Sequence, residues 1–176
     1  MAVRAPAEVA EGTLVFTDIV GFTEFTALRG DEEAIELLSR QEALVRGALP
    51  ANARIVKELG DGLLLWFADA CEAVNTTFEL QRAFEAESAE TMLPLWVRVG
   101  MHTGPATKRG DDLVGHAVNV AARVVDVAGP GEVLCSETTL AQVDDKLPHV
   151  AFEELGPVVM KGIPDPVALY RARPRE

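Results

Sequence analysis

The chain has 176 residues, the size of one ordinary domain, and its 48% apolar and 25% charged residues are typical of a globular protein rather than a disordered one. A net charge of −12 argues against a nucleic-acid-binding protein, and no apolar run approaches the roughly 20 residues that span a bilayer. Because this charge also repels a triphosphate, any site for one must depend on local cations and bound metal.

The sequence predicts one domain with short ends. Residues 1–11 are expected to form a short flexible lead and residues 12–173 a single domain, because no repeat or linker divides them. The start lacks the long apolar segment of a secretory signal. Cys71 and Cys135 have neither disulfide-framework nor metal-site spacing. They are interpreted as reduced thiols of a cytoplasmic domain that makes no membrane contact.

The first part of the chain predicts a strand and two helices. Residues 12–19 are a short apolar run that indicates a buried strand ending at a carboxylate. A helix follows Gly21 and ends at Gly30, and Asp31 can cap a second helix that stops at Pro50. The apolar face of this second helix is predicted to contain Ile35, Leu38, Val45 and Leu49.

A hairpin and a long helix follow. Residues 53–59 and 63–68 flank Gly60-Asp61-Gly62, a pattern typical of two strands joined by a tight turn. Asp69 can then cap a helix that runs to about residue 88. Its buried stripe is predicted to contain Ala73, Thr77, Leu80 and Phe84.

The rest of the chain predicts a strand at 95–103, a short loop at 104–111 and a helix at 116–128. The strand-rich end is predicted to contain strands at 132–136, 150–160 and 167–172 and a short helix at 137–143. This order predicts an α+β fold, a ferredoxin-like αβ sandwich with extensions. Its mixed, mostly antiparallel sheet is expected to carry helices on one face.

Two carboxylates stand at predicted strand ends. Asp18 ends the first strand, and Asp61 lies at the tip of the hairpin. On neighbouring strands they could meet at one point, and Mg²⁺ or Mn²⁺ often takes only one or two oxygen ligands from a protein. Alternatively, both are ordinary turn residues, since aspartate is common in turns. Residues 19–23 could bind a phosphate at the start of a helix, although a plain connection also explains them.

The helix at 116–128 is apolar around most of its circumference, which predicts burial on nearly all sides. Asn119, Arg123 and Asp126 form its one narrow polar stripe. A buried arginine needs an anionic partner. Arg123 could therefore bind a phosphate, with Asn119 holding a sugar or phosphate oxygen, or it could form a salt bridge to a carboxylate such as Asp126.

Lys57 and Asp112 match the edge of adenine, which offers an acceptor at N1 and a donor at the 6-amino group. Guanine reverses this pattern and would leave both groups opposed. Alternatively, both are plain surface charges. Lys161, before Gly162, is a candidate phosphate-binding cation or an exposed turn residue. The histidines share no metal-ligand spacing and are interpreted as structural: His102, His116 and His149.

These patterns occur together, in this order, in the class III adenylyl and guanylyl cyclase homology domain, which the chain resembles from about residue 12 to 172. The resemblance is to the bacterial adenylyl cyclase type. The matching blocks are FTDIVGFT (16–23), KELGDG (57–62), RVGMHTG (98–104), DLVG (112–115), VNVAAR (118–123) and KG (161–162). The Gly-Gly-Asp/Glu-Glu-Phe hairpin of diguanylate cyclases is absent from the sequence.

The resemblance implies metal-binding and catalytic roles. Asp18 and Asp61 would hold two divalent metal ions, Mg²⁺ or Mn²⁺, with the backbone carbonyl of Ile19 as a further ligand. Asn119 would orient the ribose, and Arg123 would stabilise the transition state at the α-phosphate. Family members place the metal-binding pair and the Asn/Arg pair on different subunits. This implies a homodimer with its sites at the interface.

The resemblance also implies a substrate. Phe22, Lys57, Asp112 and Lys161 would bind it, with Lys57 and Asp112 selecting adenine and Lys161 contacting the terminal phosphates. The implied activity is that of an adenylate cyclase, which converts ATP to 3′,5′-cyclic AMP and diphosphate by a two-metal mechanism. Regulatory domains outside this chain are a further expectation.

Two alternatives to an adenylate cyclase are a guanylate cyclase and a nucleotide-binding regulatory pseudoenzyme of the same fold. The guanylate branch usually has an acidic and a small polar residue in place of Lys57 and Asp112. A pseudoenzyme would lack a metal-binding carboxylate, Asn119 or Arg123, and all of these are present.

Overall fold

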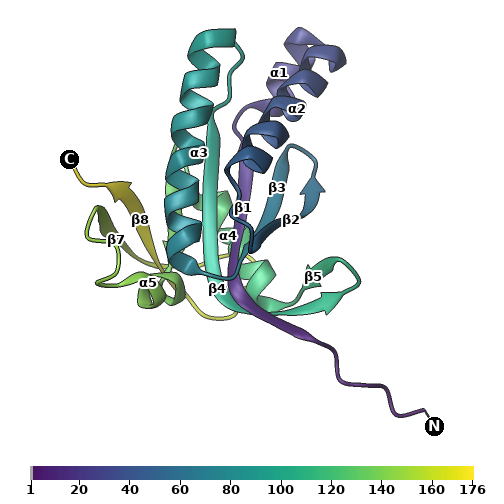
Figure 1. Cartoon of the computed structure of the whole chain (residues 1–176), viewed down its shortest axis with the longest axis vertical. Helices are drawn as coiled ribbons and strands as arrows, with labels where there is room; N and C mark the ends of the chain where they lie inside the picture. Colours follow the sequence, from purple (N-terminus) through teal and green to yellow (C-terminus); the bar gives the residue numbers. More distant parts are fainter. Residues whose placement is uncertain (1) are drawn as a thin grey trace.

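The computed structural model describes residues 2–176, so Met1 of the predicted lead lies outside the described residues. One mixed sheet has the strand order β2-β3-β1-β4-β6-β8-β7, and β5 pairs with β4 outside this path (Figure 1). The strands are β1 (Val9–Ile19), β2 (Ala53–Leu59), β3 (Gly62–Phe67), β4 (Val97–Arg109), β5 (Asp112–Val114), β6 (Val133–Ser136), β7 (Val150–Val158) and β8 (Val167–Pro174). The helices are α1 (Phe22–Arg29), α2 (Asp31–Ala48), α3 (Ala70–Thr91), α4 (His116–Val127) and α5 (Glu137–Val143). The β4–β6 pair is parallel and the other pairs are antiparallel, which confirms the predicted α+β class.

β1 lies inside the sheet because it pairs antiparallel with β3 on one side and with β4 on the other. Residues 14–16 are all buried, and their side chains alternate between the two faces of the sheet. A strand that is apolar on both faces needs cover on both. At the end of β1, the register places Asp18 opposite Gly62 of β3 and Arg98 of β4.

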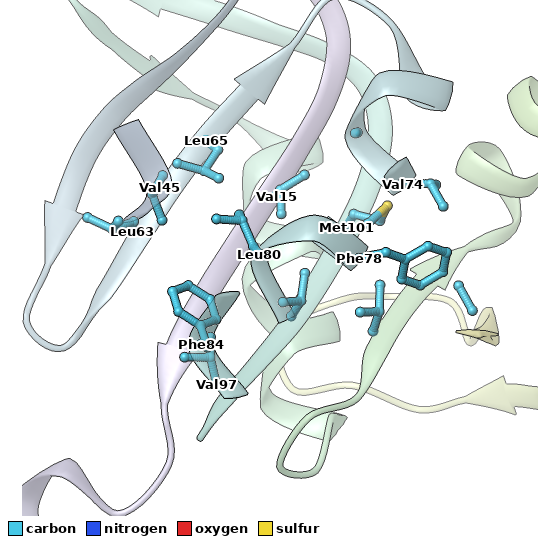
Figure 2. Packing of buried hydrophobic residues seen from close by; sticks show 14 of the residues in the cluster. Val15, Val45, Leu63, Leu65, Val74, Phe78, Leu80, Phe84, Val97 and Met101 are labelled. Atoms are coloured by element: carbon cyan, nitrogen blue, oxygen red, sulfur yellow. The ribbon is translucent and has the colours of Figure 1, made fainter. Parts of the chain in front are cut away.

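The larger apolar core lies between one face of the sheet and helices α1, α2, α3 and α5. Figure 2 shows part of this core, in which Val15 lies near Leu80 of α3 and Met101 lies near Phe78 of the same helix. The second face is covered by α4, which lies behind the central strands in Figure 1. The prediction of helices on one face was therefore wrong, because the alternating apolar residues of β1 need cover on both sides.

α2 buries a stripe that differs from the predicted one at one residue, because Val45 is fully buried and Leu38 and Leu49 pack against the core as predicted. Ile35, which was expected in the core, is 63% exposed. The buried residues of α2 are Ala34, Leu37, Gln41 and Val45. Because Gln41 is polar, the apolar pattern of the sequence did not indicate its place in this stripe. Asp31 is the first residue of the helix, and Gly30 occupies the cap position.

α3 has the predicted start and the predicted buried stripe. Oδ1 of Asp69 accepts hydrogen bonds from the N–H groups of Cys71 and Glu72. The stripe is buried at each predicted position: Ala73, Thr77, Leu80 and Phe84. The helix continues past residue 88 to Thr91. Among the described residues, no helix combines the length and apolar character needed to cross a membrane.

The predicted loop at 104–111 is mostly a strand. β4 continues to Arg109, and a turn through Gly110 leads into β5. The added part of β4 pairs with the start of β1, which begins at Val9 rather than at residue 12. Because this pairing joins segments far apart in the sequence, local composition does not reveal it.

Gly100 allows α4 to lie directly on β4. A Cβ at this position would lie 2.3 Å from the Val125 nitrogen and 2.8 Å from the Val124 carbonyl carbon, both in the α4 backbone. Gly100→Ala is therefore expected to lower the free energy of unfolding by about 3 kcal/mol, because a helix backbone cannot give way as a side chain can. Urea unfolding measures this loss.

Gly47→Ala is the matched control. Gly47 is exposed near the end of α2, and an added Cβ there would have no neighbour within 4 Å. This substitution should raise the free energy of unfolding by about 0.5–1 kcal/mol, because glycine is unfavourable in helices. Equal effects of the two substitutions would contradict the close approach of α4 to β4.

Candidate active site

The end of β1 meets the β2–β3 turn and brings Asp18 and Asp61 together. Asp18 is paired with Gly62, the residue after Asp61. The N–H of Ile19 donates to the Asp61 carbonyl over 3.4 Å. The turn lies close against β1, since a Cβ on Gly62 would be 2.3 Å from the Thr17 carbonyl oxygen. Antiparallel pairing therefore places both predicted metal-binding carboxylates at one end of the sheet.

A cleft of about 300 Å³ opens beside these carboxylates. Four of the predicted site residues line it: Asp18, Ile19, Phe22 and Asp61. Arg98 of β4 lines it as well. The structure thus gathers the proposed metal ligands and one predicted substrate-binding residue around one open space.

The first turn of α1 forms part of this cleft. Gly21 has a φ of 75°, in the left-handed region that glycine adopts readily, and α1 begins at the next residue. The N–H groups of Thr23 and Glu24 lie in the first turn, where the helix offers them no carbonyl partner. A helix start of this kind favours a phosphate, while the Glu24 carboxylate in the same turn opposes one.

Arg98 is the charged partner of Asp18. Its Nη2 and Nε lie 2.6 Å and 2.8 Å from Asp18 Oδ2. Its Nη1 donates to the Asp126 carbonyl at the end of α4 over 3.3 Å. Burial, reinforced by the hydrogen bond and charge of Asp18, raises the pKa of Asp61 to about 6. Asp18 therefore has an arginine counter-ion, whereas burial and the nearby charge of Asp18 oppose the ionisation of Asp61.

Asp18 and Asp61 fit divalent ions that need few protein ligands. Within residues 2–176, no cluster of three or more His, Cys, Asp or Glu side chains could hold an ion. Mg²⁺ commonly binds one or two carboxylates and completes its shell with water and substrate phosphate. A cation between Asp18 and Asp61 would also relieve the repulsion that raises the pKa of Asp61.

Arg98 is a site residue to which the sequence analysis gave no role, although it begins the matching block 98–104. An arginine inside an apolar strand was a usable signal, because a charge in that position needs a counter-ion. The sequence could not identify the counter-ion, because Asp18 lies 80 positions away in the chain.

Lys57 and Asp112 meet across β2 and β5. Lys57 Nζ lies 2.9 Å from Asp112 Oδ1 and 3.2 Å from Oδ2, and about a third of each side chain is exposed. The hydrogen bond from Lys57 lowers the pKa of Asp112 below its ordinary value. The two residues are therefore a specific ion pair rather than independent surface charges.

An irregularity in β2 turns Lys57 toward Asp112. Ile55 is paired with Leu65 but Lys57 with Leu64, so Val56 is an extra residue in β2. Such a bulge moves the following side chains to the other face of the sheet. Lys57 thereby shares a face with Leu64, which packs against α4.

The predicted burial of α4 is confirmed for most of its apolar residues, but its polar stripe is not buried in the protomer. Asn119 is exposed, the Arg123 side chain is 40% exposed and Val127 is 43% exposed. Arg123 Nη1 lies 3.2 Å from Asp126 Oδ2, which is the salt bridge considered from the sequence. The apolar sides of α4 pack into two separate clusters against the sheet and the C-terminal strands. The stripe between them faces away from the core.

The structure does not bring every predicted site residue together. Within residues 2–176, the cleft beside Asp18 is not lined by Asn119, Arg123 or Lys161. Lys161 is exposed in the connection between β7 and β8, where Gly162 has a φ of 79°.

Two histidines have structural partners. His102 Nδ1 lies 2.6 Å from Ser136 Oγ, and burial lowers the pKa of this histidine to about 4, so that it is neutral at pH 7. His149 Nε2 lies 2.8 Å from Asn75 Oδ1. Both contacts agree with the structural roles expected from the sequence.

Asp61→Asn is expected to stabilise the metal-free protein at pH 8 and to have little effect at pH 4. The folded-state pKa of Asp61, about 6, lies above its ordinary value of 3.8. The folded state therefore binds more protons than the unfolded state, and the contribution of protonated Asp61 to the free energy of unfolding is lost as the pH rises through 6. Asparagine imitates the protonated form at every pH. Urea unfolding of both proteins from pH 4 to 8 measures this difference, in which other titrating groups cancel. A difference independent of pH would contradict the raised pKa.

Comparison with known proteins identifies relatives along nearly the whole chain. Residues 5–172 match the family described as the adenylate and guanylate cyclase catalytic domain. A pH-sensitive adenylate cyclase of Mycobacterium tuberculosis is 31% identical over 163 residues, which are 92% of this chain and 40% of that protein. An adenylate cyclase of Streptomyces griseus is 36% identical over 120 residues, which are 68% of this chain and 29% of that protein. The chain thus spans less than half the length of these curated relatives.

Solved structures share the fold. The adenylyl cyclase CyaB from P. aeruginosa aligns with a TM-score of 0.86 at 24% identity, over 98% of both chains. The guanylyl cyclase Cya2 aligns with a TM-score of 0.83 at 23% identity, over 97% of this chain and 95% of that one. A similar fold at such identities does not distinguish the two activities. Because the family match extends over residues 5–172, the chain belongs to the adenylate and guanylate cyclase catalytic domain family.

Proposed function

We propose that this domain is an adenylate cyclase, which closes ATP into 3′,5′-cyclic AMP and releases diphosphate at a site shared by two copies of the chain. The observation that carries the proposal is the meeting of Asp18 and Asp61 at a cleft that the start of α1 also lines. Relatives from Mycobacterium tuberculosis and Streptomyces griseus are named adenylate cyclases, which supports ATP as the substrate.

The reaction joins the ribose 3′-oxygen to the α-phosphorus, breaks the bond from that phosphorus to the diphosphate, and removes the hydroxyl proton. Two divalent ions, bound by Asp18, Asp61 and the Ile19 carbonyl, would supply Lewis acidity to the hydroxyl and the phosphates. Arg98 lines the same cleft, and because its guanidinium is held by Asp18 and the Asp126 carbonyl, it would act on the phosphates through its positive charge. Phe22, the first residue of α1, lines this cleft and would contact the substrate there.

Lys57 and Asp112 would select the base. Lys57 Nζ would donate to adenine N1, and the Asp112 carboxylate would accept from the 6-amino group. The two groups are 2.9 Å apart, so they must separate to admit the base edge. Guanine presents a donor at N1, which would face the Lys57 donor, and an acceptor at C6, which would face the Asp112 acceptor. This pair therefore favours ATP over GTP.

A second copy of the chain would supply Asn119 and Arg123. Their stripe is exposed on α4 and lies outside the cleft of its own protomer within residues 2–176. A two-fold, head-to-tail homodimer would complete two equivalent clefts. Asn119 would orient the ribose, and Arg123 would offset the charge that develops on the transferring phosphoryl group.

Other parts of the proposal lie outside the cleft. Lys161, exposed between β7 and β8, would contact the terminal phosphates. The domain would act in the cytoplasm, under the control of regulatory domains outside this chain.

The test is to incubate the purified domain with ATP or GTP and either Mn²⁺ or Mg²⁺, and to identify the products by chromatography. We expect cyclic AMP from ATP and at least about 100-fold less cyclic GMP from GTP. Asp61→Asn, which keeps the shape of the side chain, should remove at least about 99% of the activity by weakening cation binding. Cyclic GMP as the main product, or no cyclic nucleotide with either metal, would overturn the proposal.

A further inference from the structure

Gln41 is a polar residue in the apolar stripe of α2. It is 1% exposed and lies between Leu37 and Val45, one helical turn away on either side, both of which are fully buried. An apolar side chain is the usual occupant of such a position, because a buried amide must replace the hydrogen bonds that it loses to water.

The amide of Gln41 reaches the turn that carries Asp61. Its Nε2 donates to the Asp61 carbonyl over 3.3 Å. The same carbonyl accepts the N–H of Ile19 over 3.4 Å. One backbone oxygen thus ties the β2–β3 turn both to α2 and to the end of β1.

This contact spans a gap in the packing. A cavity of about 200 Å³ lies between α2 and the β2–β3 turn, and Gln41 and Leu38 line it together with Gly60 and Gly62. Because the two residues that flank Asp61 have no side chains, little packing restrains the turn from this direction. The Gln41 hydrogen bond is a direct link across the cavity.

The link has a cost in stability. Oε1 of Gln41 is buried and has no hydrogen-bond partner among the described residues. A buried acceptor without a partner destabilises a fold, and an apolar residue of similar size would avoid this loss. Gln41 therefore supplies a hydrogen bond to the turn but makes the core less stable than an apolar residue would.

We propose that Gln41 is a positioning residue, which holds the backbone of Asp61 so that its carboxylate stays directed toward Asp18 and the cleft. Its effect on catalysis rests on the proposed cyclase function, whereas its effect on the turn does not. Gln41 touches neither substrate nor reacting atoms in this assignment and acts through Asp61.

The test compares Gln41→Met with Leu38→Met. Methionine has nearly the length and flexibility of glutamine but no amide, and Leu38 lines the same cavity on the same helix without a hydrogen bond to Asp61. Three quantities are measured for the wild type and both variants: the thermal midpoint, hydrogen exchange of the Ile19 amide without metal, and Mn²⁺ affinity by paramagnetic resonance. Steady-state kinetics with ATP adds kcat and KM.

For Gln41→Met we expect a thermal midpoint equal to or above that of the wild type. Exchange at Ile19 should be about tenfold faster, and Mn²⁺ affinity and kcat should each fall about tenfold while KM for ATP changes little. Leu38→Met should resemble the wild type in every measurement. Stability and function moving in opposite directions is a result that a purely structural role would not produce.

A lower thermal midpoint for Gln41→Met, with unchanged Ile19 exchange and Mn²⁺ affinity in the folded protein, would overturn the proposal. If the wild type forms no cyclic nucleotide but the variant still shows faster exchange and weaker Mn²⁺ binding, the proposed activity fails and the positioning role stands. If the wild type is active and the variant matches it in all three measurements, the positioning role fails and the activity stands.

Discussion

Asp18→Ala and Asn119→Ala proteins, each inactive when assayed separately, are expected to regain about a quarter of the wild-type activity when they are mixed. Random exchange makes half of the dimers mixed. In a mixed dimer, one of the two clefts combines an intact Asp18 from one copy with an intact Asn119 from the other. The measurement is cyclic AMP formation after the two proteins have been incubated together.

A mixture of Asp18→Ala with Asp61→Ala is the matched control. Both residues belong to the same side of the cleft in one protomer, so every cleft in a mixed dimer lacks one of them. This mixture should remain inactive. Recovery in the control, or no recovery in the first mixture after tagged subunits have been shown to exchange, would rule out sites shared in this way.

Exchanging Lys57 and Asp112, the proposed base-selecting pair, should have the second largest effect. Lys57→Glu combined with Asp112→Ser offers guanine an acceptor for its N1–H and a hydroxyl donor for its carbonyl oxygen, while adenine loses the donor to its N1 and keeps only a neutral hydroxyl as acceptor for its 6-amino group. We expect the ratio of kcat/KM for ATP to that for GTP to fall by about 1,000-fold. Initial rates with each nucleotide, at saturating Mn²⁺, measure this ratio.

Two further variants show whether the pair acts as a unit. Lys57→Glu alone places two carboxylates side by side and should depress turnover of both nucleotides. Arg54→Ala, on the same strand, removes a hydrogen bond to the Asp111 carbonyl without touching the pair, and it should leave the ratio unchanged. A preference for ATP that survives the double substitution would mean that the base is read elsewhere.

The parts of the site that the sequence predicted depend on local signals. Asp18 ends an apolar run, and Asp61 lies between two glycines that join apolar strands. Two strands joined by a tight turn must pair, so Asp61 had to lie at an end of the sheet. The pairing of β1 with β3, which brings Asp18 to that same end, was expected but could not be derived from either segment alone.

The parts that the sequence did not predict depend on contacts between distant segments. The ion pair of Arg98 with Asp18 joins residues 80 positions apart. The direction of Lys57 depends on one extra residue in β2, for which the sequence carries no distinct signal. The apolar circumference of α4 predicted burial on nearly all sides, but hydrophobicity alone does not state whether the cover comes from the same chain or from another.

α4 lies directly on the Gly100 backbone, at a distance that leaves no room for a Cβ between them. In the proposed homodimer, this contact would hold Asn119 and Arg123 at a constant position relative to Asp18 of their own copy, and turnover would be adjusted chiefly by tilting one copy against the other. Rotation about a two-fold axis treats both clefts alike. A signal that reaches the proposed homodimer should thus open or close its two clefts simultaneously, with no half-active intermediate.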